Sequence, residues 1–338
     1  MIDFSTQYLG LKLSGPIVVS STPLSESLDN LRRMEDAGAA AVVLHSLFEE
    51  QLALESRALD EDLSRGTDSF AESLDYLPDI YDYRMSHEYY LDHIRQAREA
   101  VKIPILGSLN GATPGGWVRF ASDMEQAGAS AIELNTYALA TNKSQTSAEI
   151  EQQTIDLVSS VCNAVHVPVS VKLSRSFTSI PHLVARLEGA GARGVSLFNR
   201  FYQPDFDIEA LEVRPTLHFS TPSELLSRLH WAAILYGNTN ADIALTGGVH
   251  SAEDVLKSIM AGAGVAMMAS ALHIHGIEHI GRVLSDMRYW LEKREYTSLW
   301  ETRGCLSRRS VPDKSPYDRG NYIKTLSSYS LRQTVAAF

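Results

Sequence analysis

Short apolar runs alternate with amphipathic stretches along most of the chain. Four of these runs follow an Ala-Gly-Ala sequence that ends a stretch with helical spacing, beginning at Ala37, Ala127, Ala190 and Ala261. Glycine suits the left-handed residue that ends a helix, and the apolar run after it suits a buried strand. Other runs open with a proline, which a strand tolerates at its first residue, or end in glycines, and they begin at Pro16, Pro104, Pro168 and Asp242.

In chain order, the pattern predicts eight strands, beginning at Pro16, Ala40, Pro104, Ala131, Pro168, Gly194, Asp242 and Val265. Eight βα units are the number that closes a barrel. An open, doubly wound sheet is the alternative, but it usually has fewer strands and a GxGxxG motif near its first strand, and this chain has no such motif there. We therefore predict an α/β fold, a (β/α)8 TIM barrel, as one domain over residues 1–338 with the barrel at about 16–292.

Four segments depart from this repeat. The sequence from Tyr8 to Gly15 predicts a small hairpin that caps the N-terminal face of the barrel. Residues 48–87 and 200–220 are too long for simple βα connections, and loops of this length are often lids or substrate walls. The tail, at about 297–338, is polar and poorly periodic, so we expect it to pack along the surface or to order against a partner.

Composition narrows the function. The net charge of −11 disfavours a nucleic-acid partner, because such binding needs a basic surface. The two cysteines, Cys162 and Cys305, are far apart, so we predict no disulfide scaffold, no iron–sulfur cluster and no metal site, and we expect a cytoplasmic protein. No apolar run approaches the ~18 residues of a membrane span, and the first residues lack the features of a signal peptide.

Functional groups of such barrels sit at the C-terminal ends of the strands. The polar and small residues at these ends are Ser20, Ser21, Thr22, His45, Ser46, Ser108, Asn110, Asn135, Lys172, Asn199, Thr246, Gly247, Gly248, Ala269 and Ser270. Burying a cation without a nearby anion costs free energy. We therefore expect the Lys172 ammonium to have an anionic partner, unless it reaches surface water. The turns at Gly247-Gly248 and Ala269-Ser270 predict a phosphate site, although paired glycines also form ordinary turns. His45 is open to a catalytic, a stacking or a structural role.

Several motifs carry a resemblance to a known family. They are Gly15-Pro-Ile-Val-Val-Ser-Ser, Ile132-Glu-Leu-Asn, Val169-Ser-Val-Lys-Leu, Leu245-Thr-Gly-Gly-Val and Ala269-Ser-Ala-Leu. In this order, the chain from about Phe4 to Tyr289 resembles the dihydroorotate dehydrogenase family of FMN flavoproteins, in its class 1-like and divergent members. The resemblance implies a TIM barrel, the cofactor FMN, and hydride transfer between a substrate CH–CH group and flavin N5. The family reaction converts dihydroorotate to orotate in pyrimidine biosynthesis.

The resemblance also implies roles for individual residues. The implied cofactor-binding residues are Ser20, Ser21, His45, Ser46, Asn135, Lys172, Gly247, Gly248, Ala269 and Ser270. The last four of these hold the FMN phosphate, and Ser20 and Ser21 lie along the flavin edge. Lys172 faces the N1/O2 edge of the ring and stabilises negative charge there. Asn135 contacts both flavin and substrate, and Asn199 reaches the substrate.

The substrate side departs from the family pattern. The family's catalytic base, a cysteine or serine, aligns with Ala138, and an asparagine two residues later aligns with Ala140. A family lysine is replaced by His45, and the loop at 73–79 lacks the family's asparagine. The groups left for catalysis are Lys172, Asn135 and three loop hydroxyls that would need activation to move a proton, Thr136, Tyr137 and Thr141.

Three functions follow from these residues. The first is an FMN oxidoreductase that acts on a small-molecule substrate and passes electrons to a soluble acceptor or a redox partner protein. The second is a non-catalytic FMN-binding electron-transfer subunit, which Ala138 favours and the retained Lys172 and Asn135 disfavour. The third is a phosphate-binding aldolase or isomerase barrel that uses Lys172 for Schiff-base chemistry. A homodimer is compatible with each of them.

Overall fold

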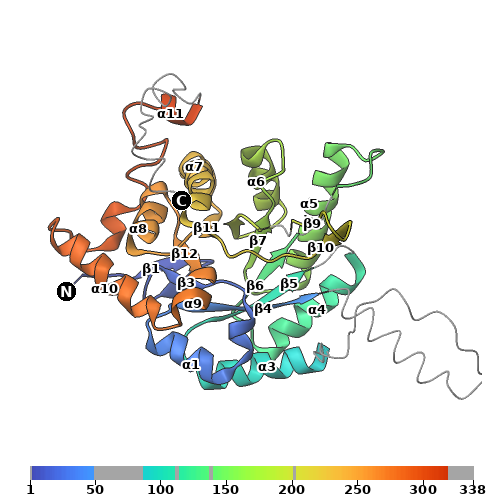
Figure 1. Ribbon diagram of the computed structural model, residues 1–338, viewed down its shortest axis with the longest axis horizontal. Helices are drawn as coiled ribbons and strands as arrows, with labels where there is room; N and C mark the ends of the chain where they lie inside the picture. The colour runs from blue at the N-terminus through green and yellow to red at the C-terminus, as the bar shows by residue number, and fades with distance from the viewer. Residues whose placement is uncertain (1, 49–86, 111–113, 137–139, 201–202, 319–338) are drawn as a thin grey trace, which may run out of the picture.

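The computed structural model describes residues 2–48, 87–110, 114–136, 140–200 and 203–318. These residues form a closed barrel of parallel strands in the order β11-β12-β3-β4-β5-β6-β7-β8 (Figure 1). The bounds are β3 (Ile17–Val19), β4 (Ala41–Phe48), β5 (Ile105–Asn110), β6 (Ala131–Asn135), β7 (Val169–Leu173), β8 (Gly194–Leu197), β11 (Asp242–Thr246) and β12 (Val265–Met268). Every predicted strand begins within one residue of its expected position, so the predicted TIM barrel is confirmed.

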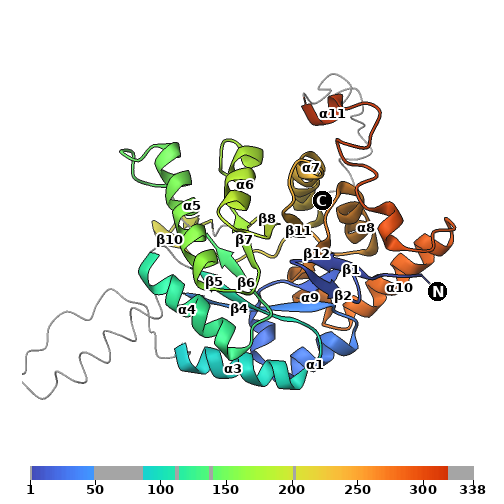
Figure 2. The same cartoon turned by 180° about the vertical axis from the view of Figure 1, so that it is seen from behind.

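Helices cover the outside of the barrel (Figure 2). The main ones are α1 (Leu28–Asp36), α3 (His87–Ala100), α4 (Pro114–Ala127), α5 (Ser147–Ala164), α6 (Ile180–Gly189), α7 (Leu225–Leu235), α8 (Ala252–Ala261) and α10 (His279–Glu292). The predicted helix-ending signal is clearest at Gly262, which follows α8 with a φ of +119°. A Cβ on Gly262 would stand 2.5 Å from Tyr236, so both conformation and packing require glycine there.

A hairpin closes the amino end of the barrel, as predicted. Its strands β1 (Thr6–Tyr8) and β2 (Leu11–Leu13) pair antiparallel. Tyr8 is only 1% exposed and packs among the apolar side chains inside the barrel. The Leu9 N–H donates to the Asp242 carboxylate at 2.7 Å, which ties the hairpin to the start of β11. The cavity described below therefore lies at the opposite end from this cap.

The long connection after β8 is one of the predicted extended loops. It carries an exposed hairpin, β9 (Asp205–Asp207) and β10 (Glu212–Arg214), and then returns to the barrel at the buried Ser220. A short turn of 3₁₀ helix, η3 (Pro222–Glu224), leads into α7. The other extended loop, at 48–87, lies almost entirely outside the described residues, as do Tyr137 and Ala138.

The described part of the tail packs along the surface, one of the two arrangements predicted for it. It contains η4 (Leu299–Thr302) and α11 (Ser315–Asp318). The backbone N–H groups of Leu306 and Arg308 donate to the carbonyls of Met260 and Ala233, which lie on α8 and α7. Within the described residues, no helix is both long and apolar enough to cross a membrane, and no three potential metal ligands lie together.

Candidate active site

A cavity of about 700 Å³ lies at the carboxyl ends of the barrel strands. Its lining includes the predicted residues Ser20, Ser21, His45, Ser46, Asn135, Lys172, Asn199, Gly247, Gly248, Ala269 and Ser270. Small-molecule sites commonly have volumes of about 300–1,000 Å³, so the cavity is large enough for a cofactor. Of the other predicted catalytic residues, Tyr137 belongs to a part of the chain that the structure does not describe. Thr136 directs its hydroxyl to the backbone carbonyl of Lys172 at 3.2 Å.

Lys172 forms a buried ion pair at the floor of this cavity. It projects from β7 and is 7% exposed, and its Nζ lies 3.2 Å from Oε1 of Glu133 on β6. Glu133 is fully buried and also accepts a hydrogen bond from Ser196 of β8 at 2.8 Å. Additional hydrogen bonds of this kind are needed to offset the desolvation of a buried pair. The predicted anionic partner is thus present, but it is Glu133, a residue of the chain itself, rather than a bound ligand.

Hydroxyl groups extend this polar contact through the inside of the barrel. The Ser196 and Ser170 hydroxyls are 3.4 Å apart, and the Ser170 hydroxyl lies 2.9 Å from the Tyr8 hydroxyl. Burial, and to a smaller degree the Glu133 charge, raises the pKa of Tyr8, so its phenol stays protonated at neutral pH. A continuous line of side-chain hydrogen bonds therefore joins the capping hairpin to the cavity floor.

Serine hydroxyls connect the strand ends around the cavity. The Ser46 hydroxyl lies 3.1 Å from that of Ser21 and 2.7 Å from that of Ser108. The Ser20 hydroxyl lies 3.0 Å from that of Thr246. Because a hydroxyl both donates and accepts, this row can adapt to the polar edge of a ligand.

His45 lines the cavity as a buried imidazole. Its ring makes an edge contact with Tyr90 at 4.9 Å and a tilted contact with His93 at 5.7 Å, measured between ring centroids. Neither ring nitrogen has a hydrogen-bond partner among the residues that the structure describes. Burial, with a smaller effect of His93, lowers the pKa of His45 to about 4, so the ring is neutral at pH 7. These contacts are consistent with each of the three predicted roles, which remain predictions.

Two asparagines meet the cavity from different strands. Asn135 ends β6 and is 7% exposed, and its side-chain oxygen has no hydrogen-bond partner within the described ranges. Asn199 follows β8, where its backbone N–H donates to the carbonyl of Leu173 at 2.8 Å. Buried polar atoms are nearly always paired in folded proteins, so the free oxygen of Asn135 favours a polar ligand at this position.

The turn at Gly247-Gly248 is tightly packed. The two glycines have φ values of +86° and +83°, and a Cβ on Gly248 would stand 2.6 Å from the backbone nitrogen of Leu225. The Ser220 hydroxyl accepts from the Gly248 N–H at 3.1 Å, and the Ser220 N–H donates to the Ser270 hydroxyl at 3.0 Å. Ser220 thus joins the two turns that were predicted to hold a phosphate.

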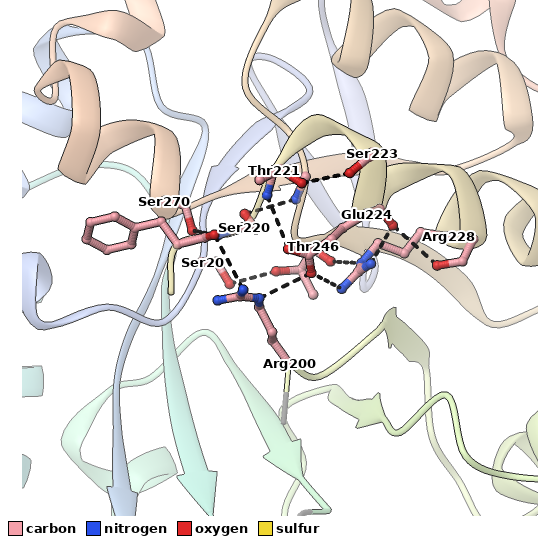
Figure 3. A network of polar contacts seen from close by, with 12 residues as sticks. Ser20, Arg200, Ser220, Thr221, Ser223, Glu224, Arg228, Thr246 and Ser270 are labelled. Carbon is pink, nitrogen blue, oxygen red and sulfur yellow. Dashed lines mark hydrogen bonds and ion pairs between the residues drawn. The ribbon is translucent and has the colours of Figure 1, made fainter. Parts of the chain in front are cut away.

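Sequence reasoning missed two arginines beside this turn. Arg228 on α7 is 4% exposed and donates to the backbone carbonyls of Thr246 and Glu224. Arg200, which lines the cavity, pairs with the Glu224 carboxylate at 3.1 Å, and the Arg228 guanidinium lies 3.9 Å from the same carboxylate (Figure 3). A signal for Arg228 exists in the sequence, because it occupies the buried face of α7 between Leu225 and Ala232.

Comparison with known proteins gives one consistent family. Residues 84–291 match the family profile described as Dihydroorotate dehydrogenase. A protein of Aeropyrum pernix, assigned as a dihydroorotate dehydrogenase A (fumarate), is 30% identical over 64% of this chain and 71% of its own length. The dihydroorotate dehydrogenase B (NAD(+)) catalytic subunit of Thermoplasma acidophilum is 24% identical over 91% of this chain and all of its own length.

A third relative agrees with these two. The dihydroorotate dehydrogenase A (fumarate) of Limosilactobacillus reuteri is 29% identical over 60% of this chain and 68% of its own length. The match to the family profile covers more than half of the 338 residues and includes β5 through α10, which supply most of the cavity lining. The chain is therefore a member of the dihydroorotate dehydrogenase family and an oxidoreductase of that type.

Proposed function

We propose that the chain binds FMN non-covalently in this cavity and transfers hydride between a substrate CH–CH group and the cofactor. The observation that carries the proposal is that buried Lys172 and Asn135 border the same cavity as the Gly247-Gly248 turn. The same end of the barrel therefore offers a charged group, Lys172, for the flavin ring and a tight glycine turn for the FMN phosphate. Family membership supports the same cofactor, because the family consists of flavoproteins.

Four features of the described residues fit FMN. The cavity volume of about 700 Å³ suits a cofactor, and the unpaired oxygen of Asn135 calls for a polar ligand atom. Around the glycine turn, two guanidinium groups face one carboxylate, that of Glu224, and this leaves one positive charge for a phosphate. Ser220 and Ser270 add hydroxyl groups beside the turn.

The chain's own residues have separable tasks in the proposed reaction. FMN supplies the hydride-accepting chemistry at its N5 atom. Lys172 would hold a positive charge beside the flavin ring, and Ser20 and Ser21 would bind the edge of that ring. Asn135 and Asn199 orient the substrate from the ends of β6 and β8, where both strands hold them firmly. Such fixed placement is a large part of enzymatic rate enhancement.

The described residues and Ala138 offer no evident base to remove a proton from the substrate. Ala138 has no group that accepts a proton, and Ala140 is exposed and equally inert. The hydroxyl of Thr136 is half-buried and donates to the Lys172 carbonyl, so it would have to leave that bond to take part. We therefore propose that dihydroorotate is a poor substrate, and that the preferred substrate has a more acidic carbon or an activated double bond.

The visible spectrum of the purified protein tests the proposal. Protein loaded with FMN should show flavin absorbance that survives gel filtration, and a true substrate or product should bleach or restore it under anaerobic conditions. Protein that retains no flavin after incubation with FMN contradicts the proposal. Anaerobic titration with dihydroorotate and with a panel of activated alkenes then identifies the substrate class.

A second candidate is an FMN-binding electron-transfer subunit that performs no substrate chemistry, and Ala138 is the observation that favours it. In that case the flavin would be reduced by a redox partner protein, while no small molecule bleaches it. An aldolase or isomerase is disfavoured, because Lys172 is engaged by Glu133 whereas Schiff-base chemistry needs an uncharged amine.

A further inference from the structure

We infer that Glu133 is a positioning residue that sets how strongly Lys172 acts on a bound flavin; this rests on the proposed FMN site. Lys172 lines the cavity, whereas Glu133 is fully buried behind it and is not among the described lining residues. Among the described residues, Glu133 meets the cavity lining through its 3.2 Å contact with Lys172. Glu133 does not contact the substrate, but its charge affects a ligand bound beside Lys172.

Charge balance links Glu133 to a ligand bound beside Lys172. At a separation of a few ångströms in a partly dehydrated site, the attraction between two unit charges is strong. Glu133 is the one acidic side chain that contacts the Lys172 ammonium among the described residues. For a ligand at the cavity floor, the negative charge of Glu133 therefore offsets much of the positive charge of Lys172.

A second hydrogen bond fixes the Glu133 carboxylate towards Lys172. Its other carboxylate oxygen accepts the Ser196 hydroxyl at 2.8 Å, which leaves Oε1 for the lysine. Ser196 in turn lies 3.4 Å from Ser170 and 3.5 Å from Tyr8, measured between hydroxyl oxygens. All four of these side chains are buried, so the carboxylate is held by the barrel interior rather than by solvent.

This arrangement predicts opposite effects for the two members of the pair. Glu133→Gln removes the compensating negative charge, so the electrostatic potential at the flavin ring becomes more positive. Lys172→Met removes the positive charge itself. If the pair had only a structural role, both variants would instead change sulfite affinity in the same direction.

Sulfite binding to the FMN-loaded protein measures this charge. The sulfur lone pair of sulfite forms a bond to flavin N5, and an electron pair of the conjugated ring moves to N1, so the adduct is stabilised by nearby positive charge. The dissociation constant is read from the loss of visible flavin absorbance. We expect at least about tenfold tighter sulfite binding in Glu133→Gln and at least about tenfold weaker binding in Lys172→Met.

Two further variants separate the mechanism from folding defects. Glu133→Asp keeps the buried charge but withdraws it by one methylene, so its sulfite affinity should lie between those of wild type and Glu133→Gln. This variant carries the test if Glu133→Gln does not fold. The double variant Glu133→Gln/Lys172→Met should bind sulfite with an affinity between those of the two single variants, because the fields of the two charges add at the ring.

Glu188→Gln is the matched control. Glu188 also accepts side-chain hydrogen bonds, from Thr239 at 2.8 Å and from Asn240 at 2.6 Å, but it lies outside the cavity lining. Its sulfite affinity should equal that of wild type. FMN-loaded Glu133→Gln and Glu133→Asp with wild-type sulfite affinity would overturn this inference alone, whereas protein that takes up no FMN would overturn the proposed function and the inference together.

Discussion

The guanidinium of Arg228 packs directly against Gly247: a Cβ on that glycine would stand 2.8 Å from Nη2 of Arg228. Arg228 cannot retreat easily, because it is 4% exposed and donates to the carbonyls of Thr246 and Glu224. The turn proposed to hold the FMN phosphate is therefore backed by a fixed cation. This relationship makes the glycine and the arginine separately testable.

Gly247→Ala should weaken FMN binding by at least about tenfold and reduce stability by roughly 1–3 kcal/mol, because it places a side chain at a φ of +86° against Arg228. Fluorescence titration with FMN and urea unfolding measure the two effects. Gly189→Ala is the control, since nothing lies within 4 Å of its added Cβ. Equal FMN affinity in both variants would show that the phosphate binds elsewhere.

Arg228→Met should lower the free energy of unfolding by about 2–4 kcal/mol, because it removes the donor to the Thr246 and Glu224 carbonyls and one of the two guanidinium groups near the Glu224 carboxylate. Arg228→Lys should recover only part of this loss, since an ammonium cannot reproduce the planar fork. Arg32→Met, at a side chain that is 52% exposed, should change stability by less than about 0.5 kcal/mol. Chemical denaturation compares the three, and full recovery by lysine would contradict the fork geometry.

Stability should fall as the pH drops from about 6.5 to about 4, in part through His45. Burial lowers the pKa of His45 to about 4, whereas in the unfolded chain it titrates near 6.5. Between these values the unfolded chain binds a proton that the folded chain does not, so protonation favours unfolding. The loss of unfolding free energy through His45 is on the order of 3 kcal/mol, and it is complete once the pH is below the pKa of His45 in the folded protein.

His45→Phe tests this pH dependence. The variant keeps a ring against Tyr90 but removes the titrating group, so its unfolding free energy should depend less on pH between about 7 and about 4.5. The exposed His218, changed to phenylalanine, is the control and should leave the pH profile unchanged. A His45→Phe profile as steep as that of wild type would mean that other groups carry the dependence.

Ala138→Cys and Ala138→Ser should raise the rate of dihydroorotate oxidation if the pocket still accepts that substrate. A positioned general base typically contributes about 10²–10⁴-fold, so the wild-type chain should show trace activity at most. Anaerobic flavin bleaching by dihydroorotate measures the rate. Wild-type turnover as fast as that of relatives with the base would contradict the role proposed for Ala138, and unchanged rates in both variants would indicate a different substrate.

The sequence by itself determined the architecture, because strands and helix ends are encoded locally. The short apolar runs predicted the first residue of all eight barrel strands to within one position, and the barrel order then places every strand end at one mouth. For this reason most predicted site residues, from Ser20 to Ser270, line the same cavity. These features depend on spacing of a few residues, which a linear pattern records directly.

The tertiary structure alone decided how the charges of the site are balanced. Lys172 was correctly expected to need an anion, but only the register of β6 against β7 brings Glu133, 39 residues earlier in the chain, to its ammonium. Likewise, Arg228 and Ser220 reach the glycine turn from α7 and from the loop before it, at separations of 18 and 28 residues. A side chain's hydrogen-bond partner depends on strand register and helix rotation, and neither is written in the order of neighbouring residues.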